Sequence, residues 1–80
     1  PNPAGGLTTI SYTVEKDGQV QITLNNKTGT LNRLLLNTFQ KAGTYTLEIN
    51  TSDLQGGNYF YTINDASGSK PVTKQLIIKR

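Results

Sequence analysis

Polar and apolar residues alternate along several short segments of the chain. In residues 7–14, for example, Ile10, Tyr12 and Val14 are separated by Ser or Thr. An alternation with a period of two is typical of a β-strand that buries one face. The segments with this alternation, or with a short apolar run, are residues 7–14, 19–25, 30–37, 44–50, 58–64 and 72–80. Turn-forming residues separate them, so the sequence predicts an all-β fold, a small antiparallel β-sandwich.

The first two predicted strands are joined by a short connection. Asp17 and Gly18 lie in it, and both residue types adopt the positive φ angles that tight hairpin turns require. We therefore expect residues 7–14 and 19–25 to pair as an antiparallel hairpin.

The third predicted strand is less regular than the others. Its three consecutive leucines, residues 34–36, indicate either a strand covered on both faces or a β-bulge that shifts the register. A short helix over residues 31–41 is the alternative. The strand is favoured because Asn32, Asn37 and Thr38 are poor helix formers.

Three consecutive aromatic residues lie in the fifth predicted strand. The alternation places Tyr59 and Tyr61 on one face, so we expect both rings to fill the core with their hydroxyl groups at its rim. Phe60 then points outward and is exposed. The preceding glycine, Gly57 or Gly56, supplies a backbone conformation that lets the chain turn sharply into the strand.

The residue types that carry most enzyme chemistry are missing. The 80 residues form one domain and include no His and no Cys. Their absence removes thiol chemistry, disulfides and Cys-based metal sites, and it argues against an enzyme because acid–base and nucleophilic catalysis usually rely on these side chains. A Ca²⁺ site built from loop oxygens stays open, but no Ca²⁺-binding motif is present, so no cofactor is predicted.

Positive charge is concentrated near the C-terminal end. Residues 1–69 hold four basic and five acidic residues, whereas residues 70–80 hold four basic residues and no acidic one. Aromatic residues do not interleave with this basic segment, which argues against nucleic-acid binding. No apolar run approaches the ~20 residues that a membrane-spanning helix needs, so we do not expect the chain to span a membrane.

An ordered set of short motifs extends over the whole chain. The motif positions are Pro1, Asn2, Pro3, Gly29, Gly43, Gly57 and Tyr59. Together with the final segment KQLIIKR they resemble, in this order, the type A C-terminal sorting domain of type IX secretion cargo proteins. The pattern is also similar to immunoglobulin-like domains related to flagellar hook-capping proteins. Residues 25–28 depart from the family, which often has a Tyr-Asp-like pair there.

The resemblance implies a fold, a function and a set of partners. Residues 1–80 would be a single immunoglobulin-like sandwich of six to seven strands that acts as a C-terminal secretion signal. The domain would be part of a longer protein, since its first residue is Pro1 rather than Met, and the cargo would precede it. In the periplasm it would be bound by the outer-membrane type IX translocon and its shuttle protein. A sortase-type cysteine protease would then remove it, leaving the cargo at the cell surface or secreted.

The last predicted strand is the expected recognition element. Residues 72–80 would form an edge strand to which a partner adds a strand through backbone hydrogen bonds. The residues expected to be recognised are Lys74, Leu76, Ile77, Ile78, Lys79 and Arg80. The basic side chains would orient the strand against an acidic receptor, or would only protect an exposed edge from aggregation. An unpaired terminal strand also allows a strand-swapped homodimer.

A second class of function stays open. The alternative is a structural or carbohydrate-binding β-sandwich module of a surface protein. In that case Phe60 would stack on a sugar ring.

Overall fold

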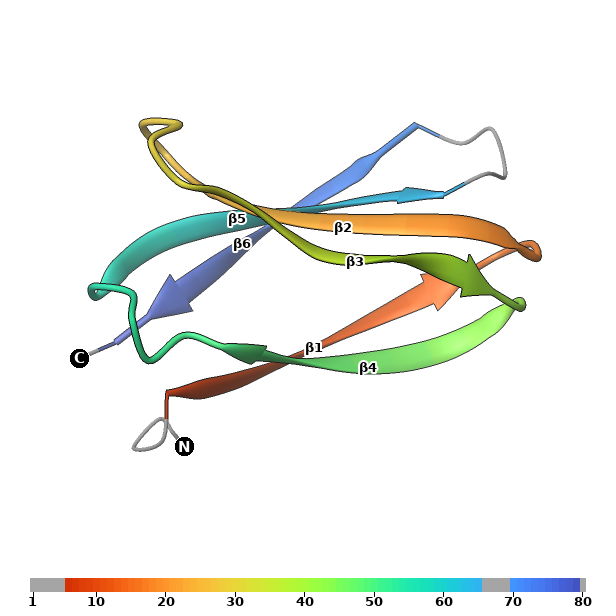
Figure 1. Ribbon diagram of the computed structural model, residues 1–80, viewed down its shortest axis with the longest axis horizontal. Coiled ribbons are helices and arrows are strands. Elements are labelled where there is room, and N and C mark those ends of the chain that lie inside the picture. The colour runs from red at the N-terminus through yellow and green to blue at the C-terminus, as the bar shows by residue number, and fades with distance from the viewer. Residues whose placement is uncertain (1–5, 66–69, 80) are drawn as a thin grey trace.

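Every regular element of the described residues is a β-strand. The computed structural model describes residues 6–65 and 70–79 (Figure 1). The strands are β1 (Leu7–Val14), β2 (Gly18–Asn26), β3 (Asn32–Gln40), β4 (Gly43–Asn50), β5 (Gly57–Asp65) and β6 (Val72–Ile78). The prediction of an all-β fold is confirmed. The predicted boundaries differ most for β3, which begins at residue 32 and continues to residue 40.

The strands form two antiparallel sheets that pack face to face (Figure 1). β1 and β4 make a two-stranded sheet, and the other sheet has the order β3-β2-β5-β6. The chain makes hairpins within the larger sheet from β2 to β3 and from β5 to β6, and it crosses between the sheets at the other connections. The arrangement is the antiparallel β-sandwich that the sequence predicts.

The predicted hairpin between the first two strands is wrong. β1 pairs with β4, with Ile10 opposite Leu47, while β2 lies in the other sheet between β3 and β5. Gly18 is not among the glycines with positive φ, so the connection is not the tight turn that would return the chain alongside β1. Both strands bury their apolar residues in one core, and alternation therefore does not distinguish a neighbour in the same sheet from a strand in the facing sheet.

The three consecutive leucines mark an irregularity in β3. The register places Ile22 opposite Leu36 and Thr23 opposite Leu34, which leaves Leu35 as an extra residue. This β-bulge lets Leu35 and Leu36 both pack against the core, whereas Leu34 is exposed. The bulge interpretation is confirmed, and the helix alternative is wrong.

The core lies between the two sheets and is built mainly from the alternating apolar residues. Its buried members are Ile10, Tyr12, Val14, Val20, Ile22, Leu24, Ile49, Leu54, Tyr59, Tyr61 and Ile78. Burying one Val, Leu or Ile side chain fully stabilises a fold by roughly 1.5–3 kcal/mol relative to leaving it exposed.

The Tyr59 hydroxyl donates a hydrogen bond to the carbonyl oxygen of Gln55, 2.7 Å away. Two of the three consecutive aromatic residues therefore serve the core, as predicted.

The start of β1 is fixed against the loop that follows β4. The side chain of Thr51 is buried there, and its hydroxyl donates a hydrogen bond to the carbonyl oxygen of Gly6, 2.8 Å away. Gly6 has a φ of +69°, and a Cβ atom on it would lie 2.6 Å from the Cα atom of Ser52. Only glycine adopts this positive φ angle so close to the backbone of Ser52 without strain. The contact ties the two strands of the smaller sheet together at one end.

Candidate recognition site

β6 is an edge strand of the larger sheet. It pairs with β5, from Val72 opposite Ile63 to Ile78 opposite Gly57. Within residues 6–65 and 70–79 no strand pairs with its other edge. Alternate N–H and C=O groups of such a strand point away from its one neighbour, and they are available to a strand from another chain. β6 thus occupies the edge position that the sequence predicts.

The predicted recognition residues within β6 lie on both of its faces. Ile78 is only 6% exposed and belongs to the core, and Leu76 is half-buried against it. Ile77 lies between them on the opposite face and is 57% exposed. Lys74 and Lys79 are exposed. The two inward residues therefore hold the strand in place, whereas Ile77 and the lysines are accessible to a receptor.

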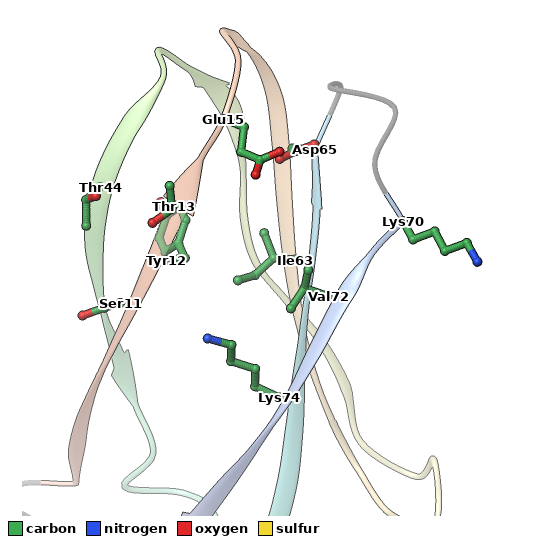
Figure 2. Close-up of a pocket in the computed structure, with 10 residues that line it drawn as sticks. All are labelled: Ser11, Tyr12, Thr13, Glu15, Thr44, Ile63, Asp65, Lys70, Val72 and Lys74. Carbon is green, nitrogen blue, oxygen red and sulfur yellow. The ribbon is translucent and has the colours of Figure 1, made fainter.

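The described basic residues of the C-terminal segment, Lys70, Lys74 and Lys79, do not form one patch. Lys79 directly follows β6, whereas Lys74 lies in the middle of the strand. Figure 2 shows the Lys74 side chain extending from β6 toward β1, while Lys70 points away from both strands. Arg80, which the sequence places beside Lys79, lies outside the described residues. The two described charges of the predicted recognition set are thus divided: Lys74 lies on the inner side of β6 and Lys79 follows its C-terminal end.

A groove of about 360 Å³ opens between β1 and the last two strands (Figure 2). Its first wall is β1, with Ser11, Tyr12 and Thr13, and the second wall is formed by β5 and β6, with Ile63 and Val72. The other lining residues are Glu15, Thr44, Asp65, Lys70 and Lys74. The sequence does not predict this groove, because its existence depends on how the strands divide between the sheets.

The motif residues lie in separate parts of the fold. Residues 1–3 lie outside the described part of the chain. Gly29 is in the turn between β2 and β3, and Gly43 begins β4. Gly57 has a φ of +154°, which other residues rarely adopt, where the chain enters β5, and Tyr59 is buried. The described motif residues serve turns and the core, and the structure does not bring them together in one site.

Phe60 lies on the outer face of the larger sheet and is half-buried, so it is less exposed than the sequence predicts. Its register partners are Asn25 on β2 and Gln75 on β6. Both partners carry amide groups that can bond to a sugar, but neither provides a second ring beside Phe60. Stacking on a sugar would therefore depend on one half-buried ring at this position.

The described residues offer little support for a metal site. Among them, no group of three or more His, Cys, Asp or Glu side chains could hold a metal ion, so the Ca²⁺ alternative has no acidic cluster there. In the same part of the chain, no helix is long and apolar enough to cross a membrane.

Comparison with known proteins identifies a family. A family model described as the secretion system C-terminal sorting domain matches residues 1–79. The match extends over nearly the whole chain and includes all the motif positions from Pro1 to Tyr59. Comparisons with curated proteins and with solved structures found no match.

Proposed function

Because the chain belongs to the secretion system C-terminal sorting domain family and is accordingly a type IX secretion signal, we propose that the secretion machinery recognises it through the outer edge of β6. A domain of this family directs the cargo that precedes it in the same chain to the cell surface or the medium. The family also suggests a module that is not catalytic. The observation that carries the proposal is the pairing of β6 with β5 alone among the described strands.

Recognition by strand addition fits the chemistry of β6. The outward backbone groups of an edge strand supply affinity, and the side chains beside them supply specificity. Ile77 is an exposed apolar side chain on the outer face of β6, and Lys79 adds positive charge at the end of the strand. A receptor with an acidic surface would associate faster with this end of the strand, because opposite charges steer the encounter.

Partner proteins carry out the later steps of secretion. We propose that the folded domain is bound in the periplasm by a shuttle protein and by the outer-membrane translocon. A sortase-type cysteine protease then removes it at the cell surface. The chain has no Cys and no His, so the nucleophile and the base for this cleavage come from the protease.

Export of a reporter tests the proposal. A reporter that carries a signal peptide and ends in the 80-residue domain is expressed in a bacterium with type IX secretion, and its amounts in the periplasm and at the cell surface are measured. We expect surface delivery of the parent and periplasmic retention after deletion of residues 76–80. Since that deletion also removes Ile78 from the core, substitutions that preserve the core are needed as well.

Exposed residues provide the sharper comparison. Ile77→Glu and Lys79→Glu change accessible side chains of the last segment, and Leu34→Glu changes an equally exposed apolar residue on β3, the opposite edge of the same sheet. We expect the first two variants to accumulate in the periplasm and the third to be exported like the parent. Normal export of both Ile77→Glu and Lys79→Glu would contradict recognition through this edge.

A further inference from the structure

The two sheets of the sandwich differ in width, which leaves part of the larger sheet uncovered. Two strands, β1 and β4, face four. Val72 lies on the same face of β6 as Ile78, yet it is 49% exposed. Ile63, its register partner on β5, is half-buried. The groove in Figure 2 lies where a third strand of the smaller sheet would pack on these two residues.

β1 borders this groove with an unprotected edge. In the described part of the chain it pairs only with β4, and its sequence, LTTISYTV, has no charged residue and no proline. The other edge strands each carry a charge: Arg33 in β3, Glu48 in β4 and Lys74 in β6. Proteins usually protect a long edge strand with charge, proline or a bulge. An unprotected edge beside an uncovered apolar surface indicates a place where another strand binds.

We propose that this groove binds an extended segment of a partner protein, which pairs with the free edge of β1 as a third strand of the smaller sheet. The occupant is a β-strand because another extended backbone supplies the alternating N–H and C=O groups that this edge requires. Every second side chain of the segment would face Ile63 and Val72, so these positions are apolar.

The charged residues that line the groove indicate where the bound segment carries an acidic residue. The carboxylates of Glu15 and Asp65 lie together at one end of the groove, and Lys74 extends toward β1 at the other end (Figure 2). Lys74 makes no ion pair with the described residues. A segment with an acidic residue near the Lys74 ammonium group would place opposite charges together at the partly open side of the groove, which favours that register over others. The expected partner strand is therefore apolar on its inner face and carries a carboxylate beside Lys74.

This inference rests on the proposed function only for the identity of the partner, a component of the secretion machinery. The binding position differs from the one in the proposed function. The segment would lie beside β1 and over the inner face of β5 and β6, whereas the secretion machinery would bind along the outer edge of β6. Recognition of β6 and occupation of the groove can therefore be separated by substitutions on the two faces of β6.

A defined peptide tests the groove in solution. The probe is a peptide as long as β1 that alternates valine and threonine, with one valine replaced by glutamate. The control peptide has the same composition with its apolar and polar residues grouped. Backbone amide signals and hydrogen exchange of the 80-residue protein are followed by NMR. We expect the probe alone to slow exchange at alternate amides of β1 and to shift the signals of Ile63 and Val72.

Matched variants assign the effect to the groove. Val72→Asp places a charge on the inner face of β6, and Thr73→Asp makes the same change at the adjacent residue, which is exposed on the outer face. We expect Val72→Asp to weaken binding of the probe by about tenfold or more, because an unpaired charge would be buried under the added strand. Thr73→Asp should bind like the parent. Protection of β3 or β6 in place of β1, or no protection at all, would overturn the inference.

The reporter assay separates this inference from the proposed function. Retention of the parent reporter in the periplasm would count against the sorting function itself. Export of the parent and of both Asp variants would leave that function intact and refute a role of the groove. Retention of Val72→Asp alone supports the groove, provided that circular dichroism shows the same unfolding temperature for both variants. If Val72→Asp is less stable, Lys74→Glu takes its place in the peptide-binding assay with Gln75→Glu as its control, since both residues are exposed. Weaker binding of the probe by Lys74→Glu alone supports the groove, and equal binding by both variants refutes it.

Discussion

The carboxylate of Asp17 accepts a hydrogen bond from the backbone N–H of Ala42, 2.8 Å away. Asp17 follows β1 and Ala42 precedes β4, so this bond joins two connections that each pass from one sheet to the other. The hydrogen bond thereby fixes the paired strands β1 and β4 relative to each other at the end where β1 finishes and β4 begins.

Replacing Asp17 with Ala should loosen this junction. We expect Asp17→Ala to lower the free energy of unfolding by about 1 kcal/mol, because the Ala42 N–H loses a charged acceptor. Asp17→Asn keeps an oxygen at the same position and should lose less. Urea denaturation followed by circular dichroism measures both values. Equal stability of Asp17→Ala and the parent would show that water replaces the carboxylate without loss.

Gly6 should be among the least replaceable residues of the fold. We expect Gly6→Ala to destabilise the protein by about 2–4 kcal/mol, since the new Cβ atom adds a clash with Ser52 to the cost of a positive φ angle. Gly29 has a similar φ of +78° but open space around it, so Gly29→Ala should cost only about 1 kcal/mol. Thermal unfolding of the two variants compares them directly. Equal losses would mean that the clash with Ser52 relaxes freely.

Adjacent isoleucines in β6 should differ sharply in their contribution to stability. We expect Ile78→Ala to lower the free energy of unfolding by about 2–5 kcal/mol, because it leaves a cavity in the core. Ile77→Ala should change the same quantity by no more than about 0.5 kcal/mol, because Ile77 is largely exposed on the surface. Chemical denaturation provides the measurement. A large loss for Ile77→Ala would contradict the exposed position of its side chain in the structure.

Phe60 should be dispensable for secretion. We expect Phe60→Ala to leave delivery of the reporter to the cell surface unchanged, because its ring lies on the outer face of β5, away from the free edge of β6. A glycan array probed with the parent and the variant examines the carbohydrate-binding alternative. Binding by the parent that is lost in Phe60→Ala, together with unchanged export of both reporters, would assign the domain a second role in sugar binding.

Alternation was sufficient to locate the strands and their buried faces. Every predicted strand is present, and even the irregular leucines at 34–36 correctly indicated a bulge. The neighbours of each strand were harder to predict, because β1 and β2 bury the same kind of face whether they share a sheet or oppose each other. The Asp17–Gly18 pair then favoured a hairpin, although the aspartate instead bonds to a distant connection.

The candidate site was predictable only in part. The edge position of β6 was expected together with the family resemblance, and the lysines of the final segment are a feature common on edge strands. The groove beside β1 did not, since it depends on the unequal division of six strands between two sheets. The different environments of Ile77 and Ile78 followed from alternation, whereas the extension of Lys74 toward β1 required the three-dimensional arrangement.

The pairing of β6 with β5 alone among the described strands makes the proposed recognition edge depend on a folded core. Ile78 anchors β6 in that core, so a domain whose core has not formed would not hold residues 72–78 as a strand with an ordered free edge. Such a domain would not display the surface that we propose the translocon binds. Unfolded polypeptides would thus be withheld from export without a separate inspection step.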